Sequence, residues 1–216
     1  MKHKIIILLI LLFFIFCFLL KTQEKFSNDE KSIIIIGNAP YKKKMGTEID
    51  KYKRVVRFNS FSLEGHEDYI GSKVTDWIVS DSFILLEKSK FLKTYKKYPN
   101  INLNIILPRV FKDNVEKLKR KLPEHIFNKA NILIQDEDIK VSDTYNFRGR
   151  WPSTGVLAIN YYVKKYNVIT ISGFNHFDPK EKTIHYYEQR KQIGHKHNLE
   201  KKIVDDLVLE GKVIRL

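Results

Sequence analysis

The chain alternates between short apolar runs and amphipathic stretches, and this alternation limits its possible folds more than any other feature. The clearest run is Ser32–Ile36, which contains four consecutive isoleucines. Because no polar residue alternates with them, these isoleucines are typical of a strand buried on both faces of a parallel sheet. Similar runs predict further strands at residues 54–58, 74–80, 101–107, 132–134, 168–172 and 213–216.

Between these strands, apolar residues recur at the spacing of one helical face. They predict three helices, which contain Val115, Leu118 and Leu122, then Val156, Ile159 and Val163, and finally Leu199, Ile203 and Leu207. Asp113 is placed to cap the first helix, the second begins near Ser153, and Gly211 would end the third. Strands that alternate with helices predict an α/β fold with a mostly parallel, Rossmann-like sheet flanked by helices.

The N-terminal segment from Ile5 to Leu20 consists of sixteen apolar residues flanked by lysines. About 20 residues span a bilayer core, and flanking lysines can extend from a shorter segment to the headgroups. A cleaved signal peptide is the alternative, but no small residues mark a cleavage site. We therefore expect an uncleaved N-terminal transmembrane signal anchor at residues 1–21, a polar stalk at 22–31 and one globular domain at 32–216.

The chain carries a net charge of +14 at neutral pH and a single cysteine, Cys17. Because Cys17 lies within the apolar segment, the globular part can form no internal disulfide. A basic surface attracts phosphates and anionic lipid headgroups, although a lysine-rich solvated surface explains the same charge. No tract interleaves basic and aromatic residues as a nucleic-acid groove does, so nucleic acid is not an expected partner.

Polar and small residues follow two of the predicted strands. Gly37 and Asn38 come directly after the isoleucine run, and Asn59 follows the strand at 54–58. In open parallel sheets, ligands collect at the carboxyl ends of the strands. If the two strands are neighbours, Asn38 and Asn59 lie side by side and can hold a phosphate and a nucleoside. A pair of turn asparagines is the alternative interpretation.

A third candidate segment opens the second predicted helix with Ser153, Thr154 and Gly155. The free N–H groups and the positive end of a helix favour an anion, and the two hydroxyl groups add donors. Ordinary helix capping by serine or threonine is the alternative interpretation.

Histidines gather near the C-terminus. His185 begins the sequence His-Tyr-Tyr-Glu, and His195 stands five residues before Glu200. Histidine titrates near neutrality, so it can act as a general base or as a phosphate partner, whereas a chance cluster on a polar loop is the alternative. Zinc is not expected, because no cysteine is available there and the spacing matches no usual zinc pattern.

These segments, in this order, resemble the sialylmotifs of the animal-type sialyltransferases, which form glycosyltransferase family 29. The stretch from Ile33 to Asp76 resembles the large motif, and Pro152–Phe174 resembles the small motif. The sequence 185–188 is similar to the third motif, and His195 with Glu200 is similar to the very small motif. Animal members join the large and small motifs by a disulfide, which this chain has no cysteines to form.

The resemblance implies a short, divergent member of this family with its GT-A-like variant of the Rossmann-like sheet. The domain at 32–216 would then transfer sialic acid, or a related nonulosonic acid such as Kdo, from its CMP donor to a hydroxyl group of a glycan acceptor. That acceptor would be a glycoprotein, a glycolipid or a lipooligosaccharide. The resemblance implies an inverting mechanism without a metal or other cofactor. It also implies a single-pass membrane protein of type II orientation, in the Golgi membrane of a eukaryote or in the inner membrane or envelope of a bacterium or virus.

The resemblance also implies roles for individual residues. The donor would be bound by Asn38, Asn59, Ser153, Thr154, Gly155 and Gly173. His185 would hydrogen-bond the departing phosphate, and His195 would be the general base that takes the proton from the acceptor hydroxyl. Glu200 would support the local helix rather than react.

Two other functions compete with this interpretation. Asp136 and Asp138 form an Asp-x-Asp sequence after a predicted strand, and such a pair can hold a divalent metal against a UDP- or GDP-sugar. Alternatively, the chain is a non-catalytic, membrane-tethered nucleotide-binding module. Chelator sensitivity distinguishes the first alternative from a metal-independent transferase, and indifference to the loss of His195 would indicate the second.

Overall fold

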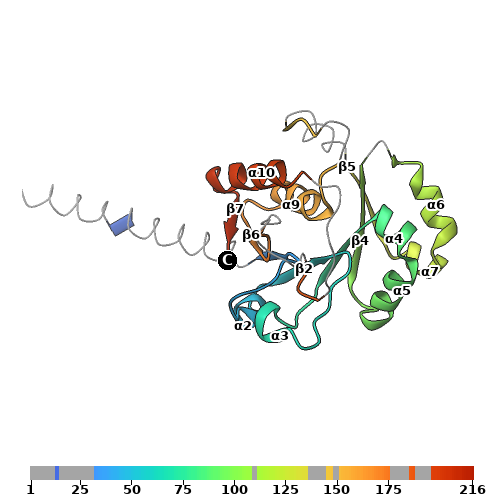
Figure 1. The fold of residues 1–216 in the computed structure, drawn as a ribbon, viewed down its shortest axis with the longest axis horizontal. Helices are drawn as coiled ribbons and strands as arrows, with labels where there is room; N and C mark the ends of the chain where they lie inside the picture. Colours follow the sequence, from blue (N-terminus) through green and yellow to red (C-terminus); the bar gives the residue numbers. More distant parts are fainter. Residues whose placement is uncertain are drawn as a thin grey trace, which may run out of the picture.

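The computed structural model describes residues 13–14, 32–108, 111–135, 145–147, 151–175, 185–187 and 196–216. These residues form a seven-stranded sheet in the order β5-β4-β3-β2-β1-β6-β7, in which every pair of neighbours is parallel (Figure 1). The strands are β1 (Ile33–Ile36), β2 (Arg54–Phe58), β3 (Asp76–Ser80), β4 (Asn102–Pro108), β5 (Asn131–Gln135), β6 (Ile169–Ser172) and β7 (Val213–Arg215). The predicted parallel sheet is confirmed, and each strand begins and ends within two residues of its predicted bounds.

Helices cover both faces of the sheet (Figure 1). One face packs against α2 (Gly46–Asp50), α3 (Glu67–Ile70), α4 (Asp81–Leu86), α5 (Lys88–Lys97), α6 (Asn114–Lys121) and α7 (Glu124–Phe127). The other face packs against α9 (Thr154–Lys165) and α10 (His197–Leu209). The three predicted helices correspond to α6, α9 and α10, whereas the sequence did not indicate α2 to α5 or α7.

The isoleucine run of β1 supplies both cores at once. Successive strand residues point to opposite faces, so Ile34 and Ile36 join the core beneath α2 to α7, while Ile33 and Ile35 join the core beneath α9 and α10. All four side chains are essentially inaccessible to solvent. A central strand with two covered faces therefore requires this uninterrupted apolar run.

Of the two predicted N-terminal caps, one is confirmed and one is wrong. The Ser153 hydroxyl accepts a hydrogen bond from the Val156 N–H at 3.4 Å, and the backbone of Ser153 is extended, as in a typical cap. Asp113 precedes α6 but makes no capping hydrogen bond through its side chain. Its backbone is already helical, with φ −66° and ψ −16°, because a tight turn rather than an extended residue leads into α6.

Among the described residues, none of the helices is long and apolar enough to cross a bilayer. The predicted anchor at residues 5–20 lies outside the described residues apart from Phe13 and Phe14. The division of the chain into anchor, stalk and globular domain therefore stays a prediction.

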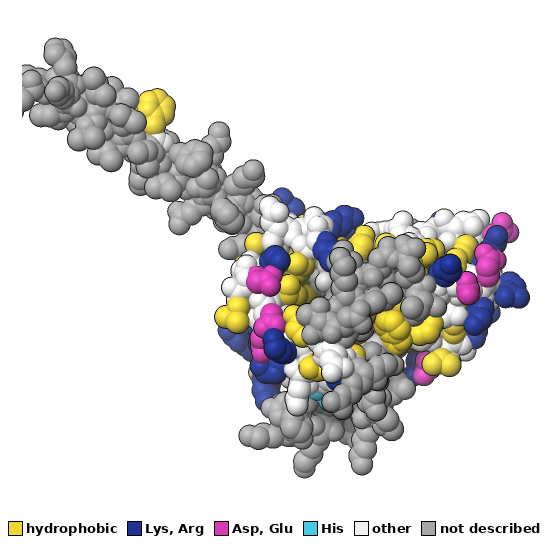
Figure 2. Space-filling view, turned by 90° about the horizontal axis from the view of Figure 1, so that it is seen from above, with side chains coloured by type: hydrophobic (Ala, Val, Ile, Leu, Met, Phe, Trp, Pro, Cys, Tyr) yellow, Lys and Arg dark blue, Asp and Glu magenta, His cyan; other side chains and the backbone are white. Residues whose placement is uncertain are grey.

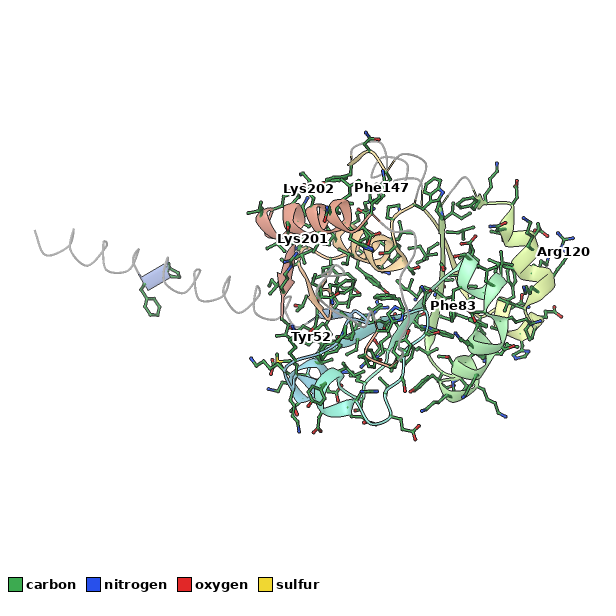
Figure 3. The ribbon with its side chains drawn as sticks, viewed as in Figure 1. Tyr52, Phe83, Arg120, Phe147, Lys201 and Lys202 are labelled. Atoms are coloured by element: carbon green, nitrogen blue, oxygen red, sulfur yellow. The ribbon has the colours of Figure 1, made fainter. Side chains whose placement is uncertain are left out.

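The charged side chains are spread over the surface. In the view from above, lysines and arginines lie around the periphery, interspersed with acidic side chains (Figure 2). Figure 3 shows Arg120 on the outer side of α6 and Lys201 and Lys202 on α10. The two α10 lysines form ion pairs with Asp205 and Asp206 one helical turn later. This distribution is that of a solvated, lysine-rich surface.

Candidate active site

All strands run in the same direction, but the order in which successive strands are added to the sheet reverses between β1 and β6. The strands from β1 to β5 lie successively on one side of this place, and β6 and β7 lie on the other. Ligands of open parallel sheets bind at the carboxyl ends of the strands that flank such a switch point. Here these ends carry Gly37 and Asn38 after β1 and Gly173 after β6. We call the carboxyl ends of β1, β2, β3 and β6 the carboxyl edge.

The two glycines of the carboxyl edge bring β1 and β6 into direct backbone contact. The Gly37 N–H donates to the Ser172 carbonyl at 2.7 Å, and a Cβ atom on Gly37 would lie 2.1 Å from the Gly173 oxygen. Gly173 has a φ of +73°, and its own Cβ atom would meet the Tyr41 hydroxyl at 2.0 Å. Only glycine fits either position.

Asn38 is almost fully buried and fastens the end of β1 to the loop after β2. Its side-chain amide donates to the carbonyl oxygen of Ser60 at 3.0 Å and, more weakly, to that of Phe58 at 3.4 Å. Asn38 thus holds the backbone on both sides of Asn59 and places the two asparagines at adjacent strand ends, as predicted from neighbouring strands.

Asn59 connects three elements of the site. Its amide donates to the Thr154 hydroxyl at 3.1 Å, and its side-chain oxygen accepts from the Ser80 N–H at 3.1 Å. Its φ of 46° lies in the left-handed region, which asparagine tolerates better than most residues. The Trp77 indole donates to its carbonyl at 2.8 Å. Asn59 therefore fixes the ends of β2 and β3 to the start of α9.

The start of α9 rests on a buried carboxylate from α10. Both the N–H and the hydroxyl of Ser153 donate to the Glu200 carboxylate at 2.8 Å. Burial raises the pKa of Glu200, and the two hydrogen bonds from Ser153 oppose that shift. Glu200 thereby supports the N-terminus of α9, where the first N–H groups, those of Thr154 and Gly155, have no acceptor within the helix.

Gly155 lets this helix start pack closely on two aromatic rings. A Cβ atom there would lie 2.9 Å from the Phe174 ring and 3.1 Å from the Phe58 ring. These two rings, from the ends of β6 and β2, lie 5.8 Å apart between centroids. Together with the Gly37–Gly173 contact and the Asn59–Thr154 hydrogen bond, this packing joins the segments that resemble the large and small motifs.

His185 lies beside the carboxyl edge because the two tyrosines that follow it are tied down. The Tyr186 N–H donates to the Asn38 carbonyl at 3.0 Å, and the Tyr187 hydroxyl donates to the Ser60 carbonyl at 2.8 Å. The His185 ring stacks on the Tyr187 ring with centroids 5.2 Å apart.

Tyr186 is the most firmly held residue of this segment. Its hydroxyl donates to the Ser62 carbonyl at 2.7 Å and accepts from the Ser62 N–H at 3.1 Å. Burial raises the pKa of Tyr186 to about 12, so the hydroxyl stays protonated at neutral pH. The uncharged hydroxyl therefore links two segments that lie 124 residues apart in the sequence.

The structure thus brings Asn38, Asn59, Ser153, Thr154, Gly155, Gly173, His185 and Glu200 together at one edge of the sheet. His195, the predicted base, lies outside the described residues, as do Asp136 and Asp138. Within the described ranges, no group of three or more histidine, cysteine or acidic side chains is arranged to hold a metal ion. The roles of the individual residues in binding and catalysis stay predictions.

Two residues that support this site, Arg57 and Tyr41, had no role predicted from the sequence, although Arg57 belongs to the same segment as Asn59. Arg57 is buried, and its guanidinium donates to the carbonyls of Ile70, Gly71 and Lys73. Tyr41 donates to the Gly37 carbonyl at 3.0 Å. An arginine inside a predicted buried strand is the one signal that could have identified Arg57, since a buried charge needs several partners.

Known proteins of one family match this chain in sequence and in fold. The model of glycosyltransferase family 29 (sialyltransferase) matches residues 11–212. The CMP-N-acetylneuraminate-beta-galactosamide-alpha-2,3-sialyltransferase 4 of Rattus norvegicus is 24% identical over 79% of this chain and 59% of its own length. The corresponding sialyltransferase 1 of Sus scrofa is 28% identical over 74% of this chain and 48% of its own length. The chain therefore spans about half to three fifths of the length of these curated relatives.

Solved structures share the fold. A mammalian sialyltransferase in complex with Gal-beta-1-3GalNAc-ortho-nitrophenol superposes with a TM-score of 0.62 at 21% identity, over 86% of this chain and 68% of that one. A monofunctional alpha-2,3-sialyltransferase from Campylobacter jejuni gives a TM-score of 0.60 at 16% identity, over 87% of this chain and 76% of that one. With the match of the family model over most of its length, the chain belongs to glycosyltransferase family 29, the sialyltransferase family.

Proposed function

We propose that this protein is a sialyltransferase that transfers sialic acid, or a related nonulosonic acid, from its CMP donor to a hydroxyl group of a glycan acceptor. One observation carries the proposal: the segments that resemble the family's motifs lie together at the carboxyl edge. Asn38, Thr154 and His185 from these segments lie around the switch point. The relatives named for CMP-N-acetylneuraminate and the solved structure with an acceptor sugar support the same donor and acceptor classes.

The start of α9 is suited to the donor's phosphate. Its first N–H groups and the positive end of the helix favour an anion. Asn59 bonds to Thr154 and Glu200 bonds to Ser153 at this helix start, so the N–H donors are arranged before the phosphate arrives. Such preorganisation lowers the free energy needed to orient groups during the reaction.

The proposed mechanism needs one base and no metal. CMP is a good leaving group, and the anomeric carbon of the donor develops positive charge as the bond to phosphate breaks. His195 would remove the proton from the acceptor hydroxyl as that oxygen attacks the opposite face, which inverts the anomeric centre. His185 would donate a hydrogen bond to the departing phosphate.

A donor panel tests the proposal. The full chain in detergent micelles is incubated with a galactoside acceptor and with CMP-sialic acid, CMP-Kdo or, in the presence of manganese, UDP-galactose. Turnover with a CMP donor is expected, and turnover confined to UDP-galactose with manganese would contradict the proposal.

We further propose that residues 5–20 anchor the enzyme in a membrane in type II orientation. The apolar length of this segment and its flanking lysines support the proposal. When cells that express the full chain are fractionated, the protein is expected to stay in the membrane pellet after washing with alkaline carbonate. Release into the supernatant would contradict an integral anchor.

A further inference from the structure

A pocket lies at the end of the sheet opposite the carboxyl edge. It has a volume of about 350 Å³, within the range of small-ligand sites, and is lined by the first residues of β2, β4 and β5 and by the last turns of α9. We call it the amino-edge pocket. The twelve residues of α9 rise about 18 Å along the helix axis, so the helix separates the two sites by roughly that distance.

The floor of the amino-edge pocket is polar. Asn102 and Asn131 are the exposed first residues of β4 and β5, and Asn104, two residues further along β4, is buried. The Asn131 amide donates to the side-chain oxygens of Asn102 at 3.0 Å and Asn104 at 3.3 Å. The three amides therefore form one hydrogen-bonded row across two strands.

This row is anchored to an ion pair between the buried Asp76 and the half-buried Arg54. The Asn102 amide donates to the Asp76 carboxylate at 2.6 Å, and the Arg54 guanidinium bonds to the same carboxylate. Arg54 also donates to the Tyr166 hydroxyl at 2.8 Å. Because the charges of Arg54 and Asp76 compensate each other, this pair fixes the amides without adding net charge to the pocket.

One positive charge remains. Lys165 lines the pocket, is exposed, and lies 5.9 Å above the ring of Tyr161, which also lines it. Within the described part of the chain, Lys165 forms no ion pair. The lining therefore combines amides that both donate and accept hydrogen bonds, tyrosine rings and a single cation.

These groups match a sugar ring more closely than other small ligands. Hydroxyl groups can pair with amides in either direction, and an aromatic ring can cover the apolar face of a pyranose. A nucleotide phosphate would require more positive charge than one lysine, and an apolar ligand would displace water from the pocket-facing amides without offering them a hydrogen bond.

We propose that the amino-edge pocket is a second saccharide site that prefers a sugar carrying one carboxylate. Asn102 and Asn131 would pair with ring hydroxyl groups, Tyr161 would contact the ring, and Lys165 would pair with the carboxylate. The site is separate from the carboxyl edge, so it binds a saccharide independently of the donor.

The test is ligand-observed saturation-transfer NMR on the full chain in detergent micelles, with N-acetylneuraminic acid as the charged probe and galactose as the neutral one. N-acetylneuraminic acid is expected to bind more tightly than galactose, and an excess of CMP is expected to leave its binding unchanged. Displacement by CMP would place the probe at the carboxyl edge and overturn the proposal, as would the failure of both sugars to bind.

Variants locate the binding. Lys165→Met is expected to raise the Kd of N-acetylneuraminic acid about fivefold, the effect of losing one exposed ion pair, and to leave galactose unaffected. Asn131→Leu is expected to raise the Kd of both sugars about tenfold. Lys164→Met, at the neighbouring exposed lysine outside the pocket lining, is the matched control and should change neither. Equal effects of the two lysine variants, or no effect of Lys165→Met, would overturn the proposal.

Discussion

The side-chain amide of Asn59 donates a hydrogen bond to the Thr154 hydroxyl at 3.1 Å, which joins the large-motif segment to the small-motif segment across 95 residues of sequence. The same side chain accepts a hydrogen bond from the Ser80 N–H. One residue thus couples the ends of β2 and β3 to the helix start that would receive the donor's phosphate. The integrity of the donor site therefore depends on Asn59.

Asn59→Ala is expected to lower the free energy of unfolding by about 1–3 kcal/mol and to weaken CMP binding, because Thr154 and Ser80 lose their partner. Urea unfolding and calorimetric titration with CMP measure the two effects. Asn59→Gly is the matched control, since glycine accepts the positive φ but lacks the amide. If Asn59→Gly binds CMP like the unaltered protein, the amide does not organise the donor site.

Gly37→Ala is expected to destabilise the protein by about 3 kcal/mol or more, because the added Cβ atom would lie 2.1 Å from the backbone oxygen of Gly173. Thermal unfolding followed by circular dichroism measures the change. Gly65→Ala serves as the comparison: Gly65 has a positive φ, unlike Gly37, but no atom lies within 4 Å of a Cβ atom there, so only backbone strain acts. It should lose only about 1 kcal/mol, and equal losses at the two positions would show that the contact between β1 and β6 is unimportant.

The raised pKa of Glu200 predicts that the free energy of unfolding depends on pH. Its folded pKa is raised above the usual 4.5 by burial, so the folded state binds this proton more tightly than the unfolded state. The contribution is fully present below pH 4.5 and is lost as the pH rises through the folded pKa. Glu200→Gln should remove this part of the pH dependence in thermal unfolding curves. Glu210→Gln, on an exposed carboxylate paired with Lys212, should leave the profile unchanged. If the profiles of the protein and Glu200→Gln run parallel, the carboxylate is not held as described.

The sheet was predictable because the pattern of apolar residues in each strand indicates how that strand is buried. Apolar β-branched runs such as that of β1 mark strands buried on both faces, and the residues that follow them mark the carboxyl edge. Helices α3 and α7 were not predictable, because four residues carry too little periodicity and such turns form only through their contacts with the sheet.

The hydrogen bonds within the site were less predictable from the sequence than the residues that form it. The hydrogen bonds from Ser153 to Glu200 and from Tyr186 to Ser62 form only because α10 and the 185–187 segment pack against the sheet as they do. No local pattern encodes such pairs. The polar row at Asn102, Asn104 and Asn131 was visible in the sequence, but its meaning required the knowledge that β4 and β5 are neighbours.

His195→Ala is expected to abolish transfer to acceptor while CMP binding stays within about twofold, because a general base contributes to the chemical step rather than to donor affinity. Product formation and calorimetric CMP titration are measured on the same preparation. His125→Ala, on α7 and remote from the carboxyl edge, is the matched histidine control. Turnover that survives the loss of His195 would remove that residue from the mechanism.

The most direct test of the proposed activity is the release of CMP from CMP-sialic acid by the full chain, with and without a panel of galactoside acceptors, in the presence and absence of EDTA. The account predicts release that requires an acceptor and is unchanged by EDTA. Absence of release with every acceptor, or release that EDTA abolishes, would contradict a metal-independent sialyltransferase.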